Sequence, residues 1–134
     1  MNIDELRPEM KGIIVAAIID TGDVNPGDWN VYLANSNNLP IENVMITSRG
    51  YGILNDESRE TSTIRWFFEK IEPHTFVMIE PIMEEVFGLT NEYYVSFYMD
   101  GIMYDKKYLF LPESIDQKYL TLVPVIQEKG VMLT

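Results

Sequence analysis

The loop at residues 20–28 gathers the side chains of this chain that best suit metal chemistry. Asp20, Asp23 and Asp28 supply carboxylates, and the loop adds an amide oxygen. Hard oxygen ligands of this kind suit calcium. The spacing differs from that of an EF-hand loop, however, and Pro26 restricts the backbone. Because the same residues are ordinary turn formers, a metal- or small-ligand-dependent protein that uses this loop is the alternative hypothesis.

Carboxylates also cluster in the middle of the chain, where paired acids could serve as a general acid and a general base. Glu80 and Glu84 would share one helix face only if the helix began before Pro81, and proline instead favours the first helical position. Glu84 and Glu85 are also favoured near a helix N-terminus by its dipole alone. His74 is the only histidine and follows a proline in a turn, so we expect it at an exposed tip. With no cysteine and no nucleophile motif, the sequence predicts no catalytic residue and no cofactor, and an enzyme is not expected.

A polar, glycine-containing stretch at residues 49–62 is expected to be a long surface loop. Its start matches neither the Walker phosphate-binding pattern nor the dinucleotide-binding fingerprint. Long loops on rigid scaffolds often carry binding residues, which makes Arg49, Tyr51 and Arg59 the candidates here.

Aromatic side chains are the second set of binding candidates. Trp29 and Trp66 fall on the apolar side of alternating stretches, so we expect both in the core. Tyr94 and Tyr98 fall on the opposite side of their stretch and are expected to face solvent. Neighbouring aromatic residues on one face form a protein-binding patch or meet another part of the fold.

These candidates must be positioned by β-strands, because short apolar–polar alternations separated by turn residues recur along the chain. Strands are predicted at 13–19, 29–34, 41–48, 64–69, 76–80, 93–99, 102–111, 119–126 and 131–133. Pro124 places its strand at an edge or a bulge. The one helical signal is the short segment 81–88. With too few helices to cover parallel strands, the chain is predicted to be a single all-β domain over residues 1–134, an antiparallel two-sheet sandwich of eight or nine strands with one short helical turn.

The strongest local signal is Asp100-Gly101, a pair that readily takes the positive φ angles of a type I′ turn and fixes the register of the flanking strands. The residues that then face one another towards the core are mainly apolar: Met99, Phe97 and Val95 opposite Ile102, Tyr104 and Lys106. Continued alternation would carry Phe110 inward and Leu111 outward. An outward leucine would expose a large apolar side chain to solvent. We therefore expect either a bulge near Lys106-Lys107 that breaks the alternation or a cover on both faces of the hairpin.

Short stretches resemble immunoglobulin-like sandwich domains. Residues 31–35 followed by 41–44 resemble the crossing from the second to the third strand of such modules, and 71–73 before 76–79 resemble their hairpin after a proline turn. Residues 91–95 resemble the entry to a sixth strand with a tyrosine corner, whose phenol hydroxyl bonds to the upstream backbone. The resemblance implies an immunoglobulin-like fold without the inter-sheet cysteines, and it implies nothing about function.

The segments 30–52, 61–108 and 128–133 together are similar to a small family of uncharacterised Bacteroidetes proteins. Members often carry the label of a phenylalanyl-tRNA synthetase alpha subunit. A class II synthetase core needs a much longer chain, an ATP-binding arginine motif and basic surfaces for tRNA, whereas this chain has 134 residues, four scattered arginines and an excess of acid. The similarity therefore implies a shared fold and assigns no activity to particular residues.

Charge and length limit the classes of partner. The net charge is −11, from 21 acidic and 10 basic residues. Such a surface repels phosphate backbones and anionic lipids, so we expect no nucleic-acid partner and no membrane partner. The apolar run at 13–19 is too short to span a bilayer, and it lacks a basic segment before it and a cleavage pattern after it, so a cytoplasmic protein is expected.

Two hypotheses about function follow. The favoured one is a non-enzymatic protein-binding or assembly module, which the sandwich signals and the lack of a catalytic constellation in the sequence indicate. The alternative is the metal- or small-ligand-dependent protein described above. Homodimerisation through an exposed edge strand near Pro124 is compatible with either hypothesis.

Overall fold

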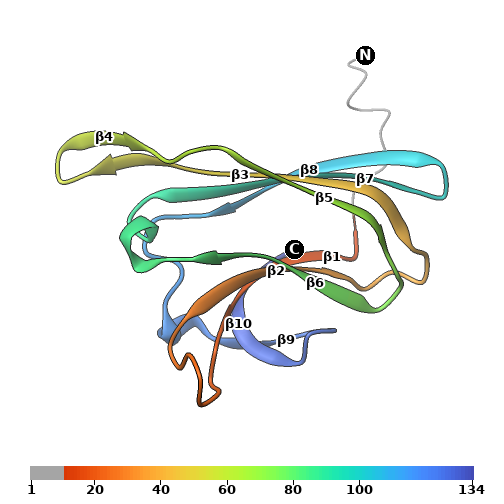
Figure 1. Cartoon of the computed structure of the whole chain (residues 1–134), viewed down its shortest axis with the longest axis horizontal. Helices are drawn as coiled ribbons and strands as arrows, with labels where there is room; N and C mark the ends of the chain where they lie inside the picture. Colours follow the sequence, from red (N-terminus) through yellow and green to blue (C-terminus); the bar gives the residue numbers. More distant parts are fainter. Residues whose placement is uncertain (1–10) are drawn as a thin grey trace.

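In the computed structural model, which describes residues 11–134, two antiparallel five-stranded sheets pack face to face (Figure 1). Sheet A contains β1 (Ile13–Ile19), β2 (Trp29–Asn35), β6 (Thr75–Ile82), β9 (Thr121–Val123) and β10 (Glu128–Leu133). Sheet B contains β3 (Ile41–Leu54), β4 (Glu57–Glu60), β5 (Ile64–Ile71), β7 (Thr90–Met99) and β8 (Ile102–Phe110). The prediction of an all-β, antiparallel two-sheet sandwich is confirmed, with ten strands in the described part of the chain.

The order of strands in the two sheets is that of an immunoglobulin-like sandwich. Sheet A runs β6-β2-β1-β10-β9, and sheet B runs β4-β3-β7-β8, with β5 on the same side of β3 as β4. The first two strands share a sheet with β6, while β3 shares the other sheet with β7 and β8, which is the Greek-key pattern of such domains. Strands β10 and β9 extend sheet A beyond β1.

Most of the core lies between the two sheets, where alternate side chains of the strands point inward. Strand β1 differs, because all seven of its residues are buried. A second, smaller apolar cluster covers its outward side, where Ile14 and Ile18 pack with Val123 and Ile126. Burial on both faces explains why the sequence of β1 is an unbroken apolar run rather than an alternation.

The prediction of a loop at 49–62 is wrong, because β3 continues to Leu54 and forms a hairpin with β4 that projects past the end of sheet A (Figure 1). Asn55 and Asp56 form its turn, and their φ angles are 54° and 64°. Asn and Asp tolerate the left-handed conformation that both central residues of a type I′ turn require. Residues whose polar composition indicates a loop therefore occupy exposed strand positions.

The segment 81–88 contains less helix than predicted. Pro81 belongs to β6, where it is tolerated because β6 is an edge strand of sheet A. The helical part is the single 3-10 turn η2 (Glu84–Val86), and a second such turn, η3 (Gln117–Tyr119), precedes β9. Of the two tryptophans expected in the core, Trp29 is buried, whereas Trp66 is half-buried.

The C-terminal strands also differ from the prediction. The strand expected at 119–126 is limited to β9, and the chain then turns, with positive φ at Val125 and Gln127. Strand β10 begins at Glu128, ahead of the strand expected at 131–133, and its first residues pair with β9.

The β7–β8 hairpin has the predicted register, with Met99 opposite Ile102 and continuous pairs as far as Asn91 opposite Phe110. Alternation is strict: Phe110 is buried and Leu111 is exposed, so the hairpin has neither the bulge nor the second cover that we expected as alternatives. The tyrosine-corner prediction is wrong. The Tyr93 hydroxyl lies between the sheets and donates to the Glu80 carboxylate (3.1 Å) rather than to the upstream backbone.

No helix within residues 11–134 is long and apolar enough to cross a membrane. The charged residues of the first ten positions, on which the expectation about targeting partly rests, lie outside the described residues.

Candidate functional site

The outer face of sheet B carries a set of exposed apolar side chains. Outward sheet faces of sandwiches are normally polar. Here five large apolar residues from four strands are each between 38 % and 59 % exposed: Phe67, Met45, Tyr98, Met103 and Tyr94. We call these five residues the sheet B patch.

Strand register places the members of the patch next to one another. Met45 of β3 lies directly opposite Phe67 of β5, and Tyr98 of β7 lies directly opposite Met103 of β8. The partner of Met45 on β7 lies between the two tyrosines. Tyr94 points to the same side of β7 as Tyr98, because side chains alternate along a strand. Opposed residues of an antiparallel pair are close enough for their side chains to touch, so the five residues form one surface.

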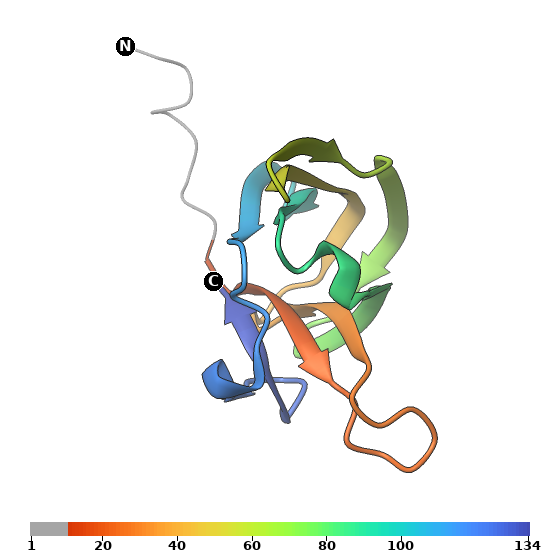
Figure 2. The ribbon, with the colours of Figure 1, turned by 90° about the vertical axis from the view of Figure 1, so that its left-hand side faces the viewer.

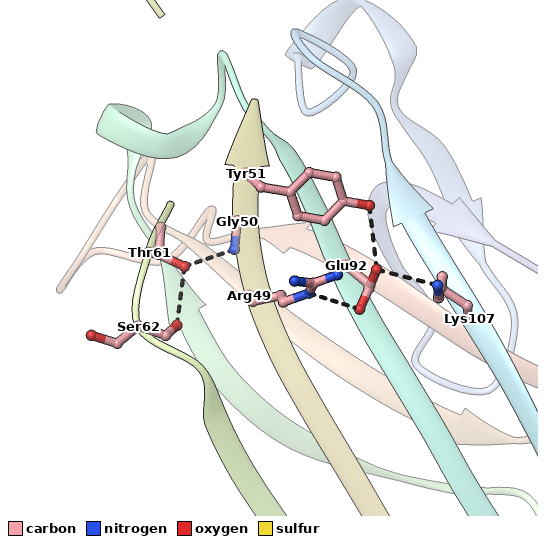
Figure 3. A network of polar contacts seen from close by, with 7 residues as sticks. All are labelled: Arg49, Gly50, Tyr51, Thr61, Ser62, Glu92 and Lys107. Atoms are coloured by element: carbon pink, nitrogen blue, oxygen red, sulfur yellow. Dashed lines mark hydrogen bonds and ion pairs between the residues drawn. The ribbon is translucent and has the colours of Figure 1, made fainter. Parts of the chain in front are cut away.

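A charged cluster, drawn in Figure 3, lies on the same face. Strand register places it next to the patch, because Lys107 lies directly opposite Tyr94. Glu92 of β7 is buried, and its carboxylate accepts one hydrogen bond from Arg49 Nε (3.2 Å) and another from the Tyr51 hydroxyl (3.3 Å). Lys107 Nζ lies 3.6 Å from the same carboxylate. The Arg49 guanidinium also lies over the Tyr51 ring, 4.8 Å from its centroid. Three adjacent strands, β3, β7 and β8, therefore contribute to one network.

Burial by itself would raise the pKa of Glu92, because a desolvated carboxylate favours its protonated form. The hydrogen bond and the charge of Arg49, the charge of Lys107 and the hydrogen bond from Tyr51 act in the opposite direction and prevail, so the pKa of Glu92 is lowered. The same hydrogen bond and the negative charge of Glu92 raise the pKa of Arg49. Glu92 is therefore ionised at neutral pH and holds two cations beside the sheet B patch.

Three basic side chains lie on this face, together with the carboxylates of Glu92 and Asp105, the second of which accepts a hydrogen bond from the Tyr94 hydroxyl (2.9 Å). One row across the sheet runs from Arg65 of β5 through Thr47 of β3 and Tyr94 of β7 to Lys107 of β8. Among the described residues, no carboxylate lies within 4.0 Å of the Arg65 guanidinium. Cations therefore border the apolar patch on both sides of Tyr94.

The structure brings together four of the five binding residues that the sequence predicted: Arg49, Tyr51, Tyr94 and Tyr98. The two tyrosines of β7 are exposed, as predicted. Arg59 does not join them. It lies opposite Gly52, so its side chain points to the other side of the β3–β4 hairpin, where it pairs with the exposed Glu57 (3.4 Å).

Sequence reasoning missed the residues that complete the face: Met45, Phe67, Met103, Glu92 and Lys107. One of them had a detectable signal, because Phe67 is an aromatic residue at the outward position between two inward ones. The role of Glu92 had none, since its burial depends on long side chains that reach it from two neighbouring strands.

The acidic loop of the alternative hypothesis projects from the sandwich between β1 and β2 (Figure 2). Within residues 11–134, no group of three or more His, Asp or Glu side chains is placed to hold a metal ion. Asp20 accepts a hydrogen bond from the backbone N–H of Gly22 (2.7 Å), which is a turn interaction, and Asp23 and Asp28 are exposed.

The other acidic candidates are also separated. Glu84 and Glu85 are exposed on η2, whereas Glu80 is half-buried and points between the sheets. His74 is exposed in the turn after β5, as predicted, with Nε2 2.8 Å from the side-chain oxygen of Asn38.

Compared with known protein families, the chain matches none. Compared with curated proteins, it has no detectable relative. Evidence about function therefore comes from the geometry of the sheet faces.

Proposed function

We propose that this chain is a non-enzymatic protein-binding module whose contact surface is the sheet B patch with the basic residues beside it. The observation that carries the proposal is the contiguous set of exposed Met, Phe and Tyr side chains on one sheet face. Aromatic residues, Met and Arg are enriched in protein interfaces, and contiguous exposed apolar surface marks interaction sites. A cytoplasmic location is part of the proposal.

The charges on this face indicate the chemistry of the partner. Glu92 holds Arg49 and Lys107 in place, and Arg65 has no acidic neighbour within 4.0 Å among the described residues. A partner surface that presents apolar side chains bordered by carboxylates would complement this arrangement. A second copy of the chain fits less well, because two molecules with a net charge of −11 repel each other.

Affinity capture with two matched double variants tests the proposal. Met45→Ser with Phe67→Ser removes two apolar side chains from the sheet B patch and is expected to abolish capture of the partner, because central apolar anchors dominate binding energy. The control is Phe76→Ser with Met78→Ser on the outer face of sheet A, where these side chains are 44 % and 51 % exposed. Both double variants replace one Met and one Phe, so any difference in partner capture between them is caused by the position of the substitutions.

The capture is read by quantitative mass spectrometry, with thermal unfolding of each variant to show that it is folded. A salt-resistant partner that the wild type and the control retain, and that the sheet B variant loses, supports the proposal. Equal retention or equal loss by the two variants would contradict it.

A further inference from the structure

A β-bulge in β6 turns the Glu80 side chain into the space between the sheets. Val31 of β2 lies opposite Glu80, whereas the next residue, Tyr32, lies opposite Met78, so Ile79 is the extra residue of β6. Bulges re-aim the side chains next to them. Simple alternation from the outward-facing Met78 would direct Glu80 to solvent, and the bulge instead places it on the same side as the buried Val31.

The Glu80 carboxylate accepts three hydrogen bonds from sheet B. Ser48 Oγ (2.7 Å) and Trp66 Nε1 (2.8 Å) both donate to Oε1, and the Tyr93 hydroxyl (3.1 Å) donates to Oε2. Burial, and then the adjacent carboxylate, raise the pKa of Tyr93, so its hydroxyl keeps its proton and remains a donor. All three donors are neutral.

A pocket of about 270 Å³ opens beside this carboxylate, between the end of β6 and the gap that separates β4 from β5. Its walls are mainly apolar and include Ile64, Ile82, Met83 and Val86. The volume is below that of a typical drug-sized site, so the pocket suits one short chain rather than a large cofactor.

The charge of Glu80 has no counterion in the described part of the chain, where no Lys, Arg or His nitrogen lies within 4.0 Å of it. A partly buried charge is screened less than an exposed one, so an uncompensated carboxylate attracts a cation strongly. Within residues 11–134, Oε2 accepts only the Tyr93 bond and keeps capacity for another donor.

We propose that this pocket binds a primary ammonium or guanidinium group carried on a short apolar stem. The cation pairs with Glu80, and the stem packs against Ile64, Ile82 and Met83. The inference does not rest on the proposed function, because Glu80 and the apolar walls lie between the sheets, whereas the sheet B patch lies on an outer face. Arg49, which is paired with Glu92 in the charged cluster, also lines the pocket.

The Trp66 indole N–H is a direct reporter, because it donates to Glu80 and the chain has two tryptophans, hence two indole signals in an NMR spectrum. The probes are n-butylammonium and n-butylguanidinium. The controls are n-butanol, which has the stem without the charge, and ammonium chloride, which has the charge without the stem, at equal ionic strength. We expect a saturable shift of the Trp66 signal with the two cationic probes, at roughly tenfold lower concentration than with butanol.

Matched variants locate the site. Glu80→Gln keeps the size of the side chain and an acceptor for Ser48 and Trp66 but removes the charge, so it should weaken binding roughly tenfold or more. Glu85→Gln removes a charge from the exposed turn η2 and should leave binding unchanged. The comparison of butylammonium with butanol uses the wild-type protein, so it holds whether or not the Glu80 variant folds. Equal binding of butanol, unchanged binding by a folded Glu80→Gln variant, or no saturable shift would overturn the proposal.

The cation can come from a free small amine or from a lysine side chain of a partner protein. Titration with a capped Gly-Lys-Gly peptide alongside n-butylammonium separates these sources. Tighter binding of the peptide assigns the pocket to a partner's side chain, and tighter binding of the free amine assigns it to a small molecule. Either result requires the charge of Glu80.

Discussion

Glu92 and Glu80 are both withdrawn from solvent, yet their surroundings differ. Glu92 lies within 4.0 Å of two cations, Arg49 and Lys107, whereas the hydrogen bonds to Glu80 come from neutral donors. At the scale of single residues, Glu92 is therefore a compensated charge that organises a surface. Glu80 lies beside a pocket and has no cation within 4.0 Å among residues 11–134, which is the property that a cationic ligand would use.

Replacement of Glu92 by Gln is expected to lower the free energy of unfolding by about 1–2 kcal/mol at neutral pH, because two cations lose their partner. The pKa of Glu92 in the folded protein lies below its ordinary value of 4.5. Its contribution is therefore complete above that value and is lost as the pH falls through the folded-state pKa. Urea unfolding of the wild type and the variant at a series of pH values checks this.

The difference in unfolding free energy should be constant above about pH 5 and shrink as the pH falls further. The exposed Glu57, changed to Gln, is the matched control and should show little difference at any pH. A difference for Glu92 that grows as the pH falls would be inconsistent with its lowered pKa.

At the scale of elements, tight turns and one bulge place the functional residues. The turn at Asn55-Asp56 extends β3 far enough to bring Tyr51 to Glu92. The bulge at Ile79 turns Glu80 away from solvent. The turn and the bulge each involve only a few residues, yet such local features determine on which side of a sheet a side chain lies.

Asp56→Ala is expected to destabilise the β3–β4 hairpin by about 1 kcal/mol, because alanine tolerates the positive φ of 64° less well than aspartate does. Hydrogen exchange of the Gly52 and Arg59 amides measures the local opening and should become faster, because alternation from the bond between Thr61 N–H and the Gly50 carbonyl makes this a hydrogen-bonded pair of the hairpin. Glu57→Ala, an exposed position of β4, is the control and should change these rates little. Equal acceleration by both substitutions would mean that the turn conformation is not the cause.

At the scale of the whole molecule, tyrosine hydroxyls of sheet B join the two sheets. Tyr108 of β8 donates a buried hydrogen bond to the carbonyl oxygen of Ile13 in β1 (2.9 Å), and Tyr93 of β7 donates to Glu80 in β6. These bonds fix the position of one sheet relative to the other, which apolar contacts alone specify less well. The shape of the pocket beside Glu80 depends on that relative position.

Tyr108→Phe is expected to reduce the free energy of unfolding by about 1–2 kcal/mol, because the buried carbonyl of Ile13 loses its inter-sheet donor. Tyr119→Phe, at an exposed position, is the matched control and should be nearly neutral. Denaturant unfolding of both variants measures the difference. A neutral Tyr108 variant would show that the hydroxyl does not contribute to holding the sheets together.

Much of the fold is determined by local features of the sequence. The apolar run at 13–19, the alternation from Trp29 onward and the turn at Asp100-Gly101 act over a few residues each, and all three predictions match the structure. The Asn55-Asp56 turn is equally local, but the polar composition of residues 49–62 led to the prediction of a loop instead of a hairpin. From the candidate site, local alternation indicated that Tyr94 and Tyr98 face solvent.

Only the tertiary structure decided how distant segments meet. The pairing of β3 with β5 and β7 places Met45 beside Phe67, brings Arg49 to Glu92 and leaves Arg59 on the other side of its hairpin. The packing of sheet A against sheet B surrounds Glu80 with donors from three strands. Periodicity and turn preferences act between near neighbours, whereas burial and charge pairing depend on which strands pack together, and a single sequence does not encode that choice in any local pattern.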